Sequence, residues 1–296
     1  MAVATKMEEV QRQNLRAIVR GAYDIQKLRI QMGNRIVGNF KVKMGQEPGK
    51  KEDEIDAEGK MILSEIRRDF AKITDGFTKM PTARKFKGQG VISEYTELVL
   101  VAEYIELKRS EEGHFKRMGK VVEAHPLWGA FLRDVKGCGA AMAGVILSEI
   151  DITKARYVSS LWKYAGLDVG TDGKGRSRRE EHLTEYEYVS KEGEIKKRKG
   201  ITFNPFLKTK LVGVLGPCFL KAGGPYSEVY RDYKHRLEGH AEYGEESKGH
   251  RHNMATRYMV KMFLKDLYVA WRALEGLPVH APYQEAKLGH VHGEAA

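Results

Sequence analysis

The stretch from Val135 to Ala143, with the sequence VKGCGAAMA, constrains the fold of this chain more than any other feature. Its two glycines flank one apolar residue, and a small alanine follows the second glycine by about one helical turn. This spacing is typical of a helix-hairpin-helix, in which two helices are joined by a tight reversal. Gly137 can adopt the positive φ angle that such a reversal requires after a helix end. We therefore predict helices over residues 127–134 and 139–150.

The reversal is also a candidate phosphate site. At Gly139 the missing side chain lets a partner approach the backbone closely, and the first amides of the following helix have no carbonyl partners within that helix. These N–H groups and the helix dipole favour an anion, which on a nucleic acid would be a backbone phosphate. The alternative is a glycine turn between two core helices that binds no ligand. The motif predicts phosphate contacts by Lys136, Gly137, Cys138, Gly139 and Ala140.

Composition narrows the class of protein. The 296 residues include 51 Lys and Arg against 40 Asp and Glu, and the formal net charge of +11 suits a polyanion such as DNA or RNA. No apolar run approaches the ~18 residues of a membrane span, and the start of the chain has no apolar signal-peptide core. We therefore expect no membrane contact. The two cysteines have no zinc-ligand spacing and cannot form a disulfide framework, which indicates a reducing, cytoplasmic location.

The apolar periodicity predicts a mainly α-helical chain in two domains and a tail. In residues 1–120, apolar residues recur at three- and four-residue intervals, which predicts helices at 7–42, 56–73 and 92–118. We interpret this part as a helical arm or coiled-coil-like hairpin. Because such arms commonly dimerise, we expect a homo-oligomer. Residues 121–275 are the predicted helix-hairpin-helix domain, and residues 276–296 a flexible tail.

The second domain contains two strongly basic segments. Alternating residues in 182–190 and 195–203 predict a small β-hairpin, and its second strand is basic. A Gly-rich basic loop at 171–179 precedes it. Further helices are predicted at 155–169, 204–220, 226–237 and 251–274. The candidate nucleic-acid contacts in the two basic segments are Lys174, Arg176, Arg178, Arg179, Lys196, Lys197 and Arg198.

The order of these elements resembles the C-terminal transposase domain of the insertion-sequence family that pairs a DEDD domain with a serine domain. The resemblance spans residues 114–275 and is carried by Gly137-Cys138-Gly139, Glu149-Ile150-Asp151, Tyr157, Ser159, Leu161 and Tyr164-Ala165-Gly166-Leu167. It implies a protein of mobile-element origin that binds DNA and catalyses DNA strand transfer. It also implies that Ser177 is the nucleophile, that the arginines beside it hold the scissile phosphate, and that Lys208 replaces a family arginine.

The first 120 residues depart from that family, because they predict helices where the family has a ribonuclease-H-like domain with strand-borne acidic metal ligands. The resemblance would then require an acidic domain from another chain, and Mg²⁺ only with that partner. The alternative is a non-catalytic DNA- or RNA-binding architectural protein, with Ser177 in a phosphate-contacting loop. A third possibility is an interaction protein that uses the helical arm.

Two other classes of site are disfavoured by spacing. Base-excision DNA glycosylases share the hairpin, but they need an aspartate farther along, and residues 157–161 contain none. His240, His250 and His252 lack a fixed carboxylate or cysteine partner, so we predict no metal site.

Overall fold

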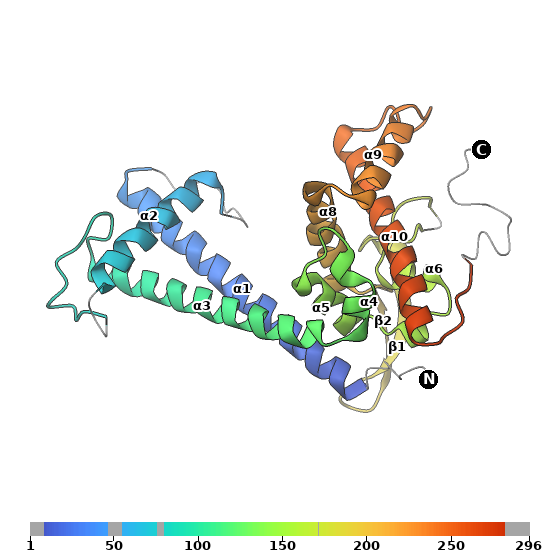
Figure 1. The fold of residues 1–296 in the computed structure, drawn as a ribbon, viewed down its shortest axis with the longest axis horizontal. Helices are drawn as coiled ribbons and strands as arrows, with labels where there is room; N and C mark the ends of the chain where they lie inside the picture. The colour runs from blue at the N-terminus through green and yellow to red at the C-terminus, as the bar shows by residue number, and fades with distance from the viewer. Residues whose placement is uncertain (1–8, 47–54, 76–79, 171, 282–296) are drawn as a thin grey trace. The chain divides into compact units, whose positions relative to one another are not determined.

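The computed structural model describes residues 9–46, 55–75, 80–170 and 172–281. These residues are mainly helical, with one antiparallel pair of strands, which confirms the predicted mainly α-helical class (Figure 1). The chain divides into two compact units. One is Ala17–Arg117, called here the N-terminal unit, and the other groups the residues up to Arg16 with those from Met118 onward, called the C-terminal unit. Among the described residues, no helix is both long and apolar enough to cross a membrane.

The N-terminal unit is built from α1 (Glu9–Lys43), α2 (Ala57–Thr74) and α3 (Tyr95–Glu123), of which α1 and α3 extend beyond it. The first helix is continuous, although Gly21, Gly33 and Gly38 lie within it. All three helices supply one apolar core: Ile36, Val37, Phe40, Leu63, Ile66, Ile73, Ile92, Leu98, Val101 and Tyr104. This core contains residues of each predicted apolar stripe, although Val10 and Ile18 of the first helix are exposed. Dimerisation through this unit stays a prediction.

The core of the C-terminal unit includes α5 (Ala140–Glu149) and one face of α10 (Lys248–Leu274). Every residue of α5 from Met142 to Glu149 is buried, so this helix runs through the interior. The long α10 buries an apolar stripe at helical spacing, formed by Met259, Val260, Phe263, Leu264, Leu267 and Trp271. Helix α9 (Pro225–Glu238) packs beside it, with the rings of Tyr233 and Tyr258 stacked 4.1 Å apart.

The helix predicted at residues 127–134 is wrong in detail. The structure has a five-residue helix, α4 (Pro126–Ala130), and a separate 3₁₀ turn, η1 (Leu132–Asp134). The chain leaves helical geometry at Phe131, whose φ and ψ are −149° and −57°. The ring of Phe131 stacks on Phe263 with centroids 6.3 Å apart, so this break places an aromatic side chain against α10.

The helix predicted at residues 204–220 is divided by a π-helical turn. It consists of α7 (Pro205–Lys210), the π turn η4 (Leu211–Leu215) and α8 (Gly216–Ala222). Pro217 has no amide hydrogen and cannot make the normal helical bond to the preceding turn. The amide of the preceding Gly216 bonds to the carbonyl of Leu211, five residues back. A normal α-helical bond spans four residues, so the helix is wider at this turn. The helix predicted at 155–169 is limited to α6 (Val158–Tyr164).

The β-hairpin forms as predicted, from β1 (Thr184–Val189) and β2 (Ile195–Gly200). The start of the predicted flexible tail is packed, because Arg272 donates a 2.6 Å hydrogen bond to the carbonyl of Pro278. The rest of that tail, residues 282–296, lies outside the described residues.

The first residues of α1 are grouped with the C-terminal unit, although the sequence placed them in the arm. Arg16 bonds both oxygens of the fully buried carboxylate of Glu149, at 3.1 and 3.0 Å. Asn204 donates a further 2.6 Å bond to the same carboxylate. These bonds satisfy a buried charge, which would be costly if it were left without partners.

Candidate functional site

The glycine turn before α5 has one exposed glycine and one packed glycine. Gly137 has a φ of +91°, and a Cβ there would lie 2.9 Å from the carbonyl oxygen of Cys218. Gly139 is the exposed N-cap of α5, with a φ of −77°, and a Cβ there would meet no atom within 4 Å. Gly137 is therefore required by packing, while the backbone at Gly139 is open to a partner.

The other predicted contacts in this turn differ in exposure. Lys136 is exposed and Ala140 is half-buried. Cys138 is a core residue with 4% of its surface exposed, and burial raises the pKa of its thiol to about 12. Its side chain therefore stays neutral and contributes to packing. Among the predicted phosphate contacts, the turn presents chiefly Lys136 and the backbone from Gly139 onward.

Residues 172–182, called here the serine loop, connect three side chains by hydrogen bonds. The Oγ atom of Ser177 lies 3.0 Å from Nδ1 of His182. On the other side of the ring, Nε2 of His182 lies 3.1 Å from both carboxylate oxygens of Asp172. His182 has 3% of its surface exposed, so the ring is held between its two partners.

The backbone of the loop favours one tautomer of His182. The amide of Ser177 donates a 3.0 Å hydrogen bond to Nδ1, which must therefore carry a lone pair. The ring proton of the neutral imidazole then resides on Nε2, facing Asp172. In this tautomer the single lone pair of Nδ1 is shared between the amide and the hydroxyl of Ser177. The Nε of Arg179 donates to the same hydroxyl oxygen at 3.1 Å and would stabilise negative charge on it.

Two local features hold this arrangement. A Cβ at Gly170 would lie 2.8 Å from Oδ1 of Asp172 and 2.9 Å from Nε2 of His182, so this hydrogen-bonded pair packs directly on glycine backbone. The amide of Lys174 donates a 3.0 Å bond to Oδ1 of Asp172. That amide, followed by His182 and Arg179, lowers the pKa of the Asp172 carboxyl. The aspartate is therefore ionised and able to orient the imidazole at neutral pH.

Beside the loop lies a group of cations, called here the cationic cluster: Arg176, Lys208, Arg257 and Lys261. Arg176 donates two hydrogen bonds, of 3.1 and 2.9 Å, to Oδ2 of Asp168. Lys208 donates to the carbonyl of Arg176, and Arg257 to the carbonyl of Gly166. These bonds draw residues that are distant in the sequence to one place.

Positive charge exceeds negative charge in this cluster. Burial lowers the pKa of Lys208 to about 8, with a further contribution from the charge of Arg257, and Asp168 opposes both effects. Burial and Arg257 likewise lower the pKa of Lys261. The desolvation and the repulsion thus outweigh the attraction of the carboxylate. An anion that entered the cluster would relieve both.

The positive charge of the basic strand β2 is partly balanced by glutamates of β1 and of the hairpin turn. Lys197 lies 3.4 Å from Glu185 and 3.8 Å from Glu187, and Lys196 lies 3.1 Å from Glu194. Arg198 lies over the rings of Tyr186 and Tyr188, at 4.8 and 5.1 Å from their centroids. Arg198 and the two tyrosines form an exposed face on which bases could stack. Because Lys196 and Lys197 are paired with glutamates, the net positive charge of this surface is smaller than the sequence of β2 alone indicates.

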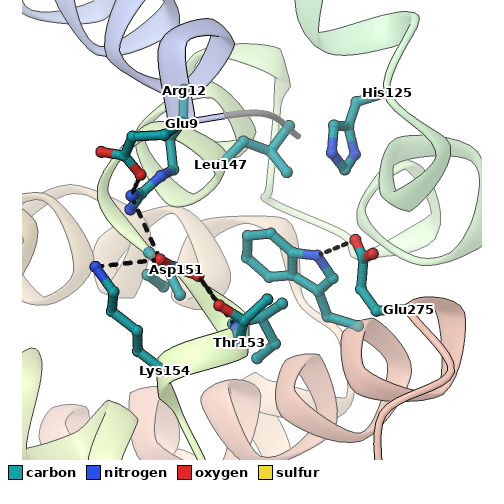
Figure 2. A pocket seen from close by; sticks show the side chains of 11 residues that line it. Glu9, Arg12, His125, Leu147, Asp151, Thr153, Lys154 and Glu275 are labelled. Carbon is teal, nitrogen blue, oxygen red and sulfur yellow. Dashed lines mark hydrogen bonds and ion pairs between the residues drawn. The ribbon is translucent and has the colours of Figure 1, made fainter. Parts of the chain in front are cut away.

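Figure 2 shows a second charged cavity of the C-terminal unit, of about 490 Å³, where the charges are paired. Arg12 bonds Glu9 and lies 3.4 Å from Asp151, which also accepts from Lys154 at 3.5 Å. His125 lines the far wall, its Nε2 is buried without a hydrogen-bond partner, and burial lowers its pKa. The paired charges stabilise the start of α1 and leave little attraction for an anion.

No metal site is evident within the part of the chain that the structure describes, where no group of three or more His, Cys, Asp or Glu side chains could hold an ion. His252 bonds the hydroxyl of Tyr230 at 2.7 Å, and Nδ1 of His240 accepts from the amide of Glu242 at 3.2 Å. The expected Mg²⁺ dependence, which required an acidic partner, stays a prediction.

The chain matches no protein-family model, curated protein or solved structure. The resemblance to a transposase domain therefore rests on the residues that carry it and stays a prediction. The site itself rests on geometry, which adds His182, Asp172, Arg257 and Lys261 to the residues expected from the sequence.

Proposed function

We propose that the C-terminal unit binds the phosphate backbone of DNA. The observation that carries this proposal is the cationic cluster, where the positive charge of four half-buried side chains exceeds the charge of Asp168. Burying a cation without a full complement of partners is costly, and a phosphate oxygen would supply charge-assisted hydrogen bonds to it. The exposed Lys174 and Arg178 of the serine loop extend the same positive surface toward solvent.

The amides at the start of α5 supply a second phosphate contact. Because Gly139 is exposed and has free space where a side chain would be, a phosphate can approach the helix start without rearrangement. RNA offers the same phosphate chemistry. We favour DNA because the resemblance is to a DNA-transferring domain, and parallel binding assays with structured RNA test that choice.

The salt dependence of DNA binding tests the proposal. We expect the double variant Lys174→Gln/Arg178→Gln to bind a duplex more weakly and to lower the slope of log affinity against log salt by about 1.8, or about 0.9 for each phosphate contact. Fluorescence anisotropy with a labelled duplex over a salt series measures this slope.

The matched control is Lys197→Gln/Lys199→Gln, which removes the same charge from the β-hairpin. Lys197 is paired with Glu185 and Glu187, and Lys199 lies 2.6 Å from Glu180, so we expect a smaller change in slope. Equal changes in both double variants would mean that net charge alone drives binding. An unchanged slope in the first variant would exclude the serine loop from the interface.

The hydrogen-bonded chain Ser177–His182–Asp172 supports a second function, DNA strand transfer. In this reaction the hydroxyl oxygen of Ser177 attacks a phosphodiester phosphorus while its proton passes to Nδ1 of His182. A bond from phosphorus to Oγ forms, the bond to one deoxyribose oxygen breaks, and that oxygen receives the proton from His182. Asp172 holds the ring, and Arg179 offsets charge on the attacking oxygen. The phosphoserine retains the ester energy, so a DNA hydroxyl can reverse the step.

A covalent complex would distinguish strand transfer from architectural binding. We expect the wild-type protein to form a detergent-resistant covalent adduct with a nicked duplex. The nick lets the cleaved fragment diffuse away, so the reverse step cannot occur and the phosphoserine intermediate accumulates. Ser177→Ala should retain duplex binding and lose the adduct, whereas Ser160→Ala should retain both. A wild-type protein that binds DNA tightly without any adduct would favour the non-catalytic alternative.

A further inference from the structure

A cavity of about 690 Å³ adjoins the serine loop and is lined by residues of that loop, α9, α10 and the segment between these two helices. Asp172 and Arg179 line it, and both also contact Ser177 or its histidine. The cavity is therefore next to the reactive serine, although Ser177 is not one of its lining residues. We call it the loop cavity.

The side chains of α10 that line the loop cavity change in character along the helix. The lining residues His250, Asn253, Arg257 and Lys261 follow one another at three- and four-residue intervals, which places them along one face of the helix. They span about 16 Å at 1.5 Å per residue. Along this length the face changes from His250 and Asn253 to the cations Arg257 and Lys261.

The cationic end of the loop cavity fits a phosphate group. Lys261 lies over Trp162, 4.4 Å from the ring centroid, which fixes its side chain. The guanidinium of Arg257 packs so closely on Gly175 that a Cβ there would overlap it. Lys174 of the same loop also lines the cavity. Several donors thus converge where one phosphate could accept from them.

An aromatic wall of the loop cavity fits a base. The stacked pair Tyr233 and Tyr258, with rings inclined by 10°, lines the cavity, and Tyr258 directly follows Arg257 on α10. Glu246 also lines the cavity, and Asn253 lies one helical turn before Arg257. A carboxylate accepts from an exocyclic amino group, and an asparagine can bond the edge of adenine, so these side chains suit an amino-bearing base.

We propose that the loop cavity binds a single unpaired nucleotide of a nucleic acid. Its phosphate contacts Arg257 and Lys261, and its base lies along Tyr258 with an amino group toward Glu246 and Asn253. This inference rests on the proposed function and names its substrate more closely: a nucleotide that has left the duplex stack, at an end, a gap or a flipped position. Its phosphate would lie beside Arg179 and hence beside Ser177.

Binding of mononucleotides to the full-length protein tests the inference. Isothermal titration calorimetry with AMP, UMP and inorganic phosphate is expected to give AMP an affinity at least 5-fold above that of either other probe, because stacking and base-edge contacts add to the phosphate contacts. Equal affinity for AMP and phosphate would overturn the inference, because the cavity would then be a plain anion site. Absence of AMP binding at millimolar concentration would overturn it as well.

Two variants distinguish the contacts to the phosphate from the contacts to the base. Lys261→Met should weaken both AMP and phosphate binding, whereas Asn253→Leu, at an exposed position, should weaken AMP binding alone. Lys248→Met, on the same helix but outside the lining, is the control and should change neither affinity. If Asn253→Leu leaves AMP binding unchanged, the assignment of the base is wrong.

The duplex-binding assay separates this inference from the proposed function. AMP binding with the expected variant pattern, without affinity for duplex DNA, would sustain the nucleotide site and remove the DNA-binding proposal. Salt-dependent DNA binding without AMP selectivity would sustain the DNA-binding proposal and remove the nucleotide site.

Discussion

The variant Gly137→Ala is expected to unfold at a much lower urea concentration than the wild-type protein, with a free energy of unfolding reduced by about 3 kcal/mol. Two costs add at this position. An alanine disfavours the φ of +91°, and its Cβ would lie 2.9 Å from the carbonyl oxygen of Cys218 and 3.1 Å from the ring of Phe219. The carbonyl belongs to the backbone of α8 and cannot rotate away. Circular dichroism during urea titration measures the difference.

The adjacent glycine provides the control. Gly139 has an ordinary φ and open space, and it occupies the N-cap of α5, where a serine oxygen can accept from an unpaired amide. Gly139→Ser should therefore leave stability unchanged or raise it by up to about 1 kcal/mol. Similar losses in both variants would show that the turn tolerates no side chain at either glycine. The contrast expected here separates the glycine that packing requires from the one that leaves room for a phosphate.

Local sequence signals predicted the parts of the fold that depend on local chemistry. The glycine turn and the hairpin around residues 191–194 have turn residues flanked by the correct periodicities, and both form. The breaks at Phe131 and before Pro217 were missed. An apolar pattern alone does not reveal that a ring will leave its helix to stack on Phe263, which is distant in the sequence. A proline inside a helical pattern does signal a break, so Pro217 indicates the irregular turn before α8.

The sequence indicated the residues of the candidate site that lie together in one short segment, but not those that packing brings to it. Ser177 and the arginines around it stand out in a basic loop, but Arg257 and Lys261 look like ordinary polar positions of an amphipathic helix. Their proximity to the loop depends on how α10 packs, which a single sequence does not specify. The basic strand shows the opposite error, because its lysines were counted without the glutamates that face them. His182 could have been found, since it lies within the same short segment as Asp172 and Ser177.

Ser177 is expected to react with diisopropyl fluorophosphate, a serine-directed reagent that requires no knowledge of the natural substrate. The serine oxygen would displace fluoride from phosphorus while its proton passes to His182. Replacing the base removes this assistance, so His182→Ala should slow labelling by about 100-fold or more. Mass spectrometry of the peptide that contains Ser177 measures the rate. Ser177→Ala should show no label on that peptide.

The variant Gly170→Ala makes this test specific to the hydrogen-bonded chain. The added methyl group would lie within 3 Å of both Asp172 and Nε2 of His182, so the carboxylate, the ring or both must shift and their hydrogen bond is disturbed. The imidazole then loses the carboxylate that orients it. We expect labelling to slow substantially, with the folded state checked by circular dichroism. Equal rates in wild-type, His182→Ala and Gly170→Ala proteins would instead identify Ser177 as an ordinary surface serine, and its bond to His182 would then serve only to shape a loop that contacts phosphates.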